Sequence, residues 1–233
     1  GEDATPDMVE AIFTEAAKFC ENELVPIYQS GDEGCQWADG VVTTPKGFKE
    51  AYAKYIEAGW TGLTGSAEMG GQGLPSSIGV AINEMMTTAN WAWAMYPGLS
   101  EGAMATLETS GTDQQKKDYL PKLISGVWSG TMCLTEPHCG TDLGLMTTKA
   151  VPKDDGSFTI DGTKIFISAG EHDLTENIVH IVLAKLPDAP RGTKGLSLFI
   201  IPKFLVAEDG SAGDRNGVRC GSIEHKMGIH GNA

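Results

Sequence analysis

The hydrophobic period of the chain changes at Gly126, and this change constrains the fold more than any other feature of the 233-residue sequence. Before Gly126, apolar residues such as Val9 and Phe13 recur at helical spacing. After Gly126, short apolar runs alternate with turn residues, which is typical of strands. We therefore predict an α+β fold with two domains, a helical bundle over residues 1–126 and a β domain over residues 127–233.

Start and stop signals divide the helical domain into segments. They predict five helices, over residues 5–24, 44–59, 75–93, 97–110 and 112–126. The fifth helix has the clearest start, because Thr112 and Gln115 have the spacing of a capping box, in which each residue satisfies a free amide of the other. Pro121 lies inside this helix and is expected to bend it or to move its start.

The β domain is predicted from short apolar runs that are separated by turn residues. These runs are residues 128–135, 157–161, 164–168, 178–185 and 195–201. Tight turns such as Asp161-Gly162 favour an antiparallel barrel or sandwich over a parallel sheet.

Four motifs follow one another along the chain. Residues 111–126 read GTDQQKKDYLPKLISG, residues 132–142 read MCLTEPHCGTD, residues 162–170 read GTKIFISAG, and residues 226–228 read KMG. In this order they resemble the acyl-CoA dehydrogenase family, namely its lead-in helix, its two signatures and the stretch before its C-terminal helical domain. The family usually has Trp and Thr where Phe166 and Ser168 stand. The resemblance covers nearly the whole chain and implies the family's helical N-terminal and middle β domains, with the C-terminal helical domain absent from this chain.

The resemblance implies FAD as the cofactor and suggests which residues surround it. The flavin-binding candidates are the backbones of Met132 and Leu134, the Thr135 hydroxyl, Gly140, Thr141, Phe166 and Ser168. Among them, Gly140 and Thr141 approach the pyrophosphate or the CoA part of the substrate, so Thr141 is also a substrate-binding candidate. Phe166 is expected to stack on the flavin, and Ser168 to hydrogen-bond near its reactive edge.

The residue types in these motifs suit a flavin on physical grounds as well. A flavin ring needs hydrogen-bonding groups at its polar edge and a flat apolar surface against its face. A strand end that is followed by a hydroxyl supplies the first, and an aromatic residue supplies the second. Singly, each residue also fits an ordinary turn or core position, so the prediction rests on the four motifs together. We expect Thr135 and Ser168 to lie on neighbouring strands with their hydroxyls converging on one cleft near Phe166.

The implied reaction is α,β-dehydrogenation of an acyl-CoA thioester, with the β hydrogen leaving as hydride to flavin N5 and a carboxylate base removing the α proton. The family's base is usually a glutamate of the C-terminal helical domain, expected beyond Ala233, so no catalytic residue is named here and the chain alone is expected to be inactive. Glu136 lies inside the flavin motif and is not assigned as the base. The insert at residues 171–178 resembles the branch that includes the methylthiopropanoyl-CoA dehydrogenases, which favours a short, sulfur-containing acyl chain. The loop at residues 69–74 is a substrate-side candidate.

Other classes of function remain open at this point. The same residues do not separate a dehydrogenase from an acyl-CoA oxidase of the superfamily. A non-catalytic flavoprotein of the alkylation-response type, which associates with DNA, would need a basic surface, and the formal net charge of −14 disfavours it. A truncated module that binds flavin poorly is a third reading. A metal or nucleophile role for His138 and Cys139 lacks a third partner in the sequence, so no metal site is predicted.

Composition bears on the partners and the location of the protein. The chain has 17 Lys and Arg against 31 Asp and Glu, which argues against nucleic acid and against anionic lipid as partners. No apolar stretch reaches the ~20 residues of a membrane helix, and the N-terminus carries no signal peptide pattern. Five scattered cysteines without CxxC spacing favour a reduced cytoplasmic protein. The resemblance adds an electron-transfer acceptor, a homo-oligomer for the full-length protein, and a place in fatty acid metabolism.

Overall fold

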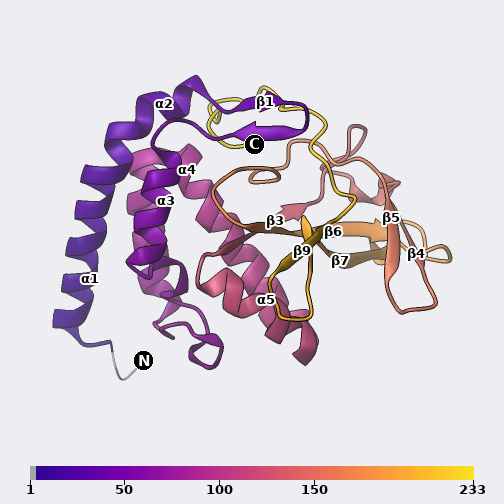
Figure 1. Ribbon diagram of the computed structural model, residues 1–233, viewed down its shortest axis with the longest axis horizontal. Helices are drawn as coiled ribbons and strands as arrows, with labels where there is room; N and C mark the ends of the chain where they lie inside the picture. The colour runs from indigo at the N-terminus through magenta and orange to yellow at the C-terminus, as the bar shows by residue number, and fades with distance from the viewer. Residues whose placement is uncertain (1–3) are drawn as a thin grey trace.

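The computed structural model describes residues 4–233. The prediction that the N-terminus carries no signal peptide pattern falls partly on residues 1–3, which lie outside the described residues. A helical layer and a β layer make up the fold (Figure 1). The prediction of a helical domain followed by a β domain is confirmed.

The helical layer occupies the N-terminal half of the chain. Its helices are α1 (Pro6–Phe19), α2 (Tyr28–Glu33), α3 (Phe48–Glu57), α4 (Ser76–Ser110) and α5 (Asp113–Ile124). Short turns of π- or 3-10-helix join them at η1 (Cys20–Leu24), η2 (Val25–Ile27), η3 (Trp60–Gly62) and η4 (Ala67–Met69). The capping box at α5 forms as predicted: Thr112 N donates to Gln115 Oε1 at 2.9 Å, and Gln115 N donates to Thr112 Oγ1 at 3.2 Å. Pro121 lies inside α5 without moving its start.

The helix break near the middle of α4 lies at Asn90 rather than at the gap between residues 93 and 97 that the sequence suggested. Asn90 has extended dihedral angles, with φ −161° and ψ 91°, inside an otherwise helical run. Its side-chain oxygen accepts from Trp93 N at 3.2 Å, and its side-chain amide donates to Leu24 O at 3.3 Å. Asn90 therefore ends one helical segment and caps the next, because its amide supplies the partners that the broken backbone lacks.

A short hairpin between α2 and α3 was not predicted. It consists of β1 (Gln36–Ala38) and β2 (Val41–Thr43), which pair antiparallel. The two residues between the strands, Asp39 and Gly40, have φ values of 50° and 83°. Such a two-residue turn with positive φ matches the twist of a hairpin, and aspartate and glycine tolerate it.

The β layer consists of one larger sheet and a hairpin. Its strands are β3 (Trp128–Cys133), β4 (Lys149–Pro152), β5 (Phe158–Asp161), β6 (Asn177–Lys185), β7 (Leu196–Pro202), β8 (Phe204–Val206) and β9 (Ala212–Arg215). The larger sheet has the order β3-β6-β4-β5, with β7 also paired to β6, and β8 pairs with β9. The 3-10 turns η5 (Leu143–Leu145) and η6 (Thr193–Gly195) lie in its loops.

Two details of the β domain differ from the prediction. The larger sheet is mixed, because β3 and β4 run parallel to β6, whereas β5 pairs antiparallel with β4 and β7 pairs antiparallel with β6. The predicted strand at residues 164–168 does not form. Phe166 has a φ of 58°, in the left-handed region, which interrupts an extended backbone however favourable the side chains are for a strand.

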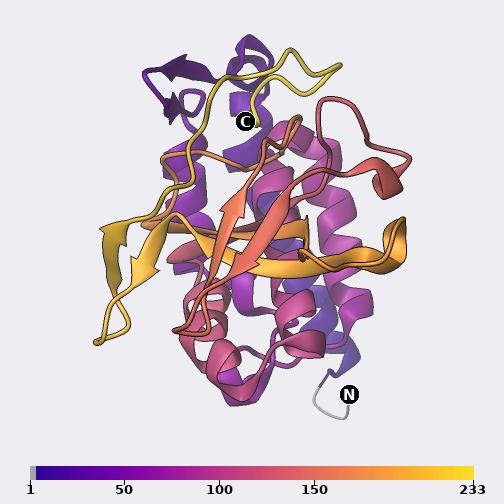
Figure 2. The same cartoon turned by 90° about the vertical axis from the view of Figure 1, so that its right-hand side faces the viewer.

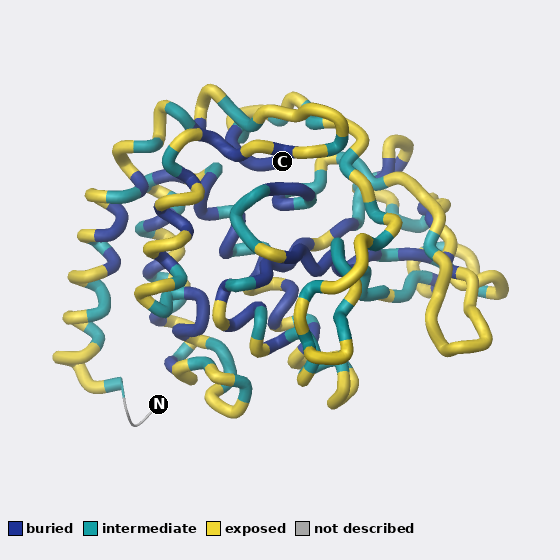
Figure 3. The backbone as a smooth tube through the Cα atoms, in the orientation of Figure 1, coloured by how far each residue is buried: buried dark blue, intermediate teal, exposed yellow. Residues whose placement is uncertain are grey.

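The buried apolar side chains of the described residues form two hydrophobic cores. One packs Phe19, Tyr52, Tyr55 and Trp93 inside the helical layer, where the Tyr55 and Trp93 rings meet edge to face at 5.3 Å. The other lies where α4 and α5 cover one face of β3 and β6 (Figures 2 and 3). A Cβ added at Gly130 in β3 would come within 2.4 Å of the Ala103 Cβ in α4, so this contact requires glycine. The close approach fixes the position of β3, whose end carries the first signature.

None of the helices in the described part of the chain combines the length and the apolar character that crossing a bilayer requires.

Candidate functional site

The structure brings the two signature segments together at the end of β3. Ile165 N donates to Thr135 O at 2.9 Å, and the Lys164 ammonium donates to Leu134 O at 3.2 Å. A third contact joins β3 to the later part of the second signature: the Thr131 hydroxyl donates to Ser168 O at 2.6 Å. Segments separated by about thirty residues are thus joined by both main-chain and side-chain hydrogen bonds.

The second signature is a loop and not a strand, so Thr135 and Ser168 do not lie on neighbouring strands as predicted. The loop runs from residue 162 to residue 176, between β5 and β6. Two of its residues that are not glycine, Phe166 and Ala169, have φ values of 58° and 54°. Such a conformation is costly for a residue with a side chain and persists where surrounding contacts hold it.

The predicted flavin residues differ in exposure along this site. Met132 is 37% exposed at the end of a strand whose other residues are buried, and Phe166 is 54% exposed in the loop. Leu134, Thr135 and Ser168 are partly buried. The apolar side chains of Met132 and Phe166 are therefore open to solvent, whereas Leu134, Thr135 and Ser168 are partly covered.

The loop after the first signature folds back on the strand end. Glu136 and Cys139 form an isolated antiparallel bridge, with N···O distances of 2.8 and 3.0 Å. This turn places Gly140 beside Thr135: a Cβ at Gly140 would come within 3.3 Å of the Thr135 Cγ2. Thr141, the next residue, is exposed. The turn therefore groups Gly140 with the predicted strand-end residues.

Glu136 connects both signatures and was not predicted to do so. Its carboxylate, in a residue only 3% exposed, accepts from the backbone N–H and the hydroxyl of Thr147 at 2.8 and 2.9 Å. It also accepts from the N–H of Thr148 at 3.0 Å, from the Thr148 hydroxyl, and from the Lys164 ammonium at 3.0 Å. Burial alone would raise the pKa of Glu136, but these hydrogen bonds outweigh it and lower the pKa to about 2. Lys164 was visible in the sequence as the third residue of GTKIFISAG, but nothing in the sequence showed its partner.

Glu136, His138 and Cys139 also bring three potential metal ligands within 4.8 Å of one another. Both oxygens of Glu136 already accept hydrogen bonds, and the Lys164 ammonium lies on one of them. The Nε2 atom of His138 lies 3.1 Å from Leu145 O, a contact in which the ring nitrogen must donate. These engagements disfavour a cation at this cluster.

The insert at residues 171–178 packs between the two layers. His172 is fully buried; its Nδ1 accepts from Leu174 N at 3.2 Å, so its Nε2 carries the proton that is donated to Ser129 Oγ at 3.0 Å. Burial lowers the pKa of His172 to about 3, with a smaller contribution from Lys203. On the other side, Asp173 accepts from the N–H and the hydroxyl of Thr44 at 3.2 and 2.6 Å. The insert thus fixes the β domain against the helical layer.

The C-terminal segment reaches the second signature. The Lys226 ammonium donates to Ser168 Oγ at 3.2 Å, and the Asn232 side chain accepts from Ala169 N at 2.7 Å. Asn232 is 1% exposed and also donates to Ala92 O of α4 at 3.2 Å. Sequence reasoning missed both residues as part of the site, although Lys226 opens the KMG motif.

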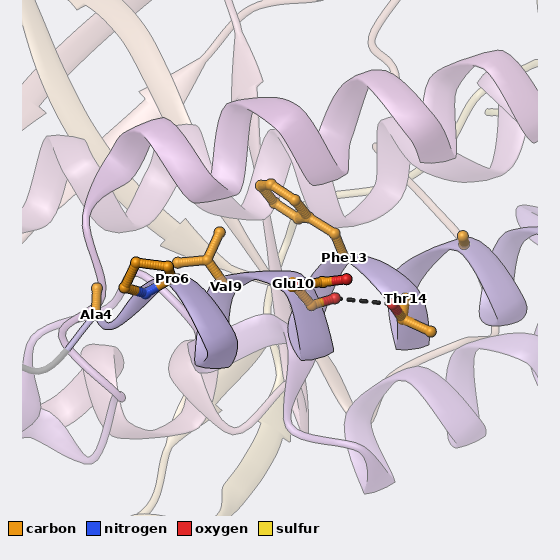
Figure 4. Close-up of a pocket in the computed structure, with 7 residues that line it drawn as sticks. Ala4, Pro6, Val9, Glu10, Phe13 and Thr14 are labelled. Carbon is orange, nitrogen blue, oxygen red and sulfur yellow. Dashed lines mark hydrogen bonds between the residues drawn. The ribbon is translucent and has the colours of Figure 1, made fainter.

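The surface of residues 4–233 is hollowed along β7 and along α1. A groove of about 1500 Å³ runs along β7 and the second signature, and Phe166 is the one predicted flavin residue that lines it. A shallower groove follows α1 and is lined by Val9 and Phe13; Figure 4 shows it with the Thr14 hydroxyl donating to Glu10 O. The α1 groove is at the far side of the helical layer, away from both signatures (Figure 1).

Comparisons with known proteins match nearly all of the described chain. Residues 6–127 match the family model for the acyl-CoA dehydrogenase N-terminal domain, and residues 131–233 match the model for the acyl-CoA dehydrogenase middle domain. A 3-methylmercaptopropionyl-CoA dehydrogenase of Ruegeria pomeroyi is 48% identical over 96% of this chain and 38% of its own length. A butyryl-CoA dehydrogenase of Syntrophomonas wolfei is 40% identical over 97% of this chain and 38% of its own. The crystal structure of a Bacillus anthracis acyl-CoA dehydrogenase complexed with FAD superimposes with a TM-score of 0.68 and 26% identity, covering 87% of this chain and 32% of that one. The chain therefore spans well under half the length of these relatives.

Proposed function

The chain belongs to the acyl-CoA dehydrogenase family, and from that premise we propose that it forms the flavin-cradling part of an FAD-dependent acyl-CoA dehydrogenase. The observation that carries the proposal is the union of the two signatures, in which Lys164 and Ile165 bind the main chain of Leu134 and Thr135. We place the boundary between the two domains at Gly126, with residues 1–126 helical and residues 127–233 forming the β domain.

The residues at this site suit a flavin. The exposed side chains of Phe166 and Met132 offer apolar surface to a ring face, and the hydroxyls of Thr135 and Ser168 offer hydrogen bonds to a ring edge. Gly140 lets the following loop approach Thr135, where a Cβ would crowd it, and so leaves bare backbone for a phosphate group. These residues, with Leu134 and Thr141, are our proposed FAD ligands.

The proposed reaction removes one hydrogen each from Cα and Cβ of an acyl-CoA thioester. When bound, FAD would accept the β hydrogen as hydride. The residues of this chain would bind the ring, cover one face of it with Phe166 and keep water from that face. Glu136 does not fit the role of the base that removes the α proton, because both its oxygens accept several hydrogen bonds and its pKa is held at about 2.

A short acyl chain is our proposed substrate class. The relative that is 48% identical carries the name 3-methylmercaptopropionyl-CoA dehydrogenase, and the one that is 40% identical is named for butyryl-CoA. Thr141 is exposed and remains our candidate for the CoA part. For the acyl side we retain the loop at residues 69–74, whose first residue, Met69, packs against the core that includes Leu123 and Ile124 of α5.

Further parts of the proposal concern the setting of the protein. We propose a cytoplasmic protein of fatty acid metabolism that passes electrons to a separate electron-transfer acceptor. The five cysteines are all free, as expected in a reducing compartment. We also propose a homo-oligomer, because large apolar side chains away from the proposed flavin contacts, such as Val80, Trp91 and Leu145, are more than half exposed.

The test uses the product of the complete natural reading frame, purified with its flavin. Anaerobic titration with butyryl-CoA and with 3-methylmercaptopropionyl-CoA should bleach the oxidised flavin absorbance, and Phe166→Ala should weaken FAD binding. Tyr28→Ala is the matched control, because Tyr28 is an exposed aromatic residue of α2, 59% accessible, that lies outside both signatures and outside the groove that Phe166 lines. A protein that binds no FAD, or whose flavin is reduced by neither thioester, would refute the proposal.

A further inference from the structure

The loop of the second signature is held at several points by residues from other parts of the chain. Thr131 binds the carbonyl of Ser168, Asn232 binds the N–H of Ala169, and the backbone oxygen of Ala233 accepts from Gly170 N at 2.8 Å. These contacts fix the main chain from the Ser168 carbonyl to Gly170. What they leave free is the rotation of the Ser168 hydroxyl.

Lys226 removes that freedom. Its ammonium lies 3.2 Å from Ser168 Oγ and 3.3 Å from Asn232 O. An ammonium group has three donors and no acceptor, so in this contact the serine oxygen must accept. The Ser168 hydrogen then points away from Lys226 and is available to donate to another group. The direction of the proton follows from the chemistry of the two groups.

The C-terminal segment that carries Lys226 is held in place independently of this contact. Tyr96 OH donates to Gly231 O at 3.0 Å, and Cys35 N donates to His230 O at 2.9 Å. The segment lies along the helical layer beside the β1–β2 hairpin (Figures 1 and 2). Lys226 is partly buried there, and burial lowers its pKa. The position of the Lys226 ammonium beside Ser168 is thus set by contacts of the C-terminal segment with Tyr96 and Cys35.

We propose that Lys226 is a positioning residue that makes the Ser168 hydroxyl a hydrogen-bond donor toward the flavin. The inference rests on the proposed function, because it takes Ser168 as a flavin contact. Lys226 acts through Ser168, because its ammonium donates to the oxygen of the Ser168 hydroxyl. Hydrogen bonds in a chain polarise one another, so this contact strengthens the hydrogen bond that Ser168 donates.

The test is a double-mutant cycle on FAD affinity in the product of the complete reading frame. Ser168→Ala should raise the Kd for FAD about fivefold, the effect of losing one neutral hydrogen bond. Lys226→Met should raise the Kd to a similar degree, and the double variant should bind no more weakly than either single variant, because the two residues act as one unit. Lys226→Arg, which also only donates, should keep an affinity close to that of the wild type. Lys226→Met should also shift the visible absorbance band of the oxidised flavin, and Lys226→Gln is a second neutral variant if Lys226→Met does not fold.

Lys54→Met is the matched control, because it removes the same charge from an exposed pair with Glu23 on the helical layer. It should leave the Kd and the spectrum unchanged. In the flavin-free protein, acetylation of the Lys226 amine should be faster in Ser168→Ala than in the wild type. A wild-type protein that binds no FAD overturns both the proposed function and this role. Intact FAD binding combined with additive effects of Ser168→Ala and Lys226→Met overturns the role of Lys226 alone.

Discussion

Replacing Glu136 by Gln should cost the protein stability in a way that depends on pH. The Glu136 carboxylate accepts from both N–H and hydroxyl groups of Thr147 and Thr148 and from Lys164. These contacts hold its pKa at about 2, against an ordinary value of 4.5. At ~1.4 kcal/mol per pKa unit, this difference corresponds to roughly 3 kcal/mol of stability at neutral pH. Glutamine keeps the shape but loses the charge, and its amide group meets donors where it needs acceptors.

The direction in which stability changes with pH follows from the lowered pKa of Glu136. Because the folded-state pKa is lower than the unfolded one, the contribution is complete above pH ~4.5 and is lost as the pH falls toward ~2. Urea unfolding at a series of pH values should therefore show a gap of roughly 3 kcal/mol between wild type and Glu136→Gln at pH 7, which shrinks below pH ~4.5 by about 1.4 kcal/mol per unit.

The control for this measurement is Glu23→Gln, which removes a carboxylate from an exposed pair with Lys54 and should change the free energy of unfolding by less than about 1 kcal/mol. If Glu136→Gln costs no more than this control at pH 7, or if its cost does not shrink in acid, the hydrogen-bonded carboxylate does not stabilise the site as the geometry indicates. The same variant should weaken FAD binding, because Glu136 and Lys164 together hold the strand end against the second signature.

Three further predictions concern other parts of the molecule. The 233-residue chain alone should bind FAD weakly and show no turnover, because Phe166 is 54% exposed on an open wall. Leaving ~200 Å² of flavin ring and contact surface exposed to water costs about 5 kcal/mol of binding free energy, which raises the Kd by between three and four powers of ten. Tight binding of one flavin per chain would contradict this prediction. Because burial lowers the pKa of His172 to about 3 from 6.5, the stability due to the neutral ring is present above pH ~6.5 and lost below it, so wild type should lose stability relative to His172→Gln when unfolding is followed from pH 7 to pH 5. Gly130→Ala should lower the free energy of unfolding by ~1–3 kcal/mol, because the new methyl group meets Ala103 of α4. Gly102→Ala in the same helix, where a Cβ meets nothing within 4 Å, should be neutral or stabilising, and equal thermal shifts for the two variants would contradict the packing argument.

The elements that the sequence predicted well are those encoded by neighbouring residues. The capping box of Thr112 and Gln115 sets the start of α5, and the apolar run over residues 178–185 becomes the buried strand β6. Both signals are local, because a cap or a strand pattern is complete within a few residues. The parallel pairing of β3 with β6 was missed because it depends on how residues 134–176 cross over, which the tight turns within that stretch do not reveal.

The site residues could be predicted because they lie within motifs that follow one another along the chain. The side chains that hydrogen-bond to them come from distant parts of the sequence. Lys164 meets Glu136 across 28 residues, and Lys226 meets Ser168 across 58. A sequence pattern records that a lysine is present, but its partner is decided by the tertiary fold. For the same reason Asn90, read as one residue of a continuous helix, proved to be the point where α4 breaks.

The failure of the predicted strand at residues 164–168 has a structural cause that bears on function. The alternation of Ile165, Phe166 and Ile167 favours a strand, but the backbone adopts a left-handed conformation at Phe166 and again at Ala169. Each such residue costs on the order of 1–3 kcal/mol, so the loop needs contacts that repay the strain. Thr131 and Asn232 supply them from a strand and from the C-terminal segment. A regular strand would have needed no such contacts, and the alternation of its side chains would have set the face to which Phe166 points. The strained loop instead leaves the Phe166 side chain 54% exposed. An exposed apolar side chain of this size is typical of a surface that binds a partner.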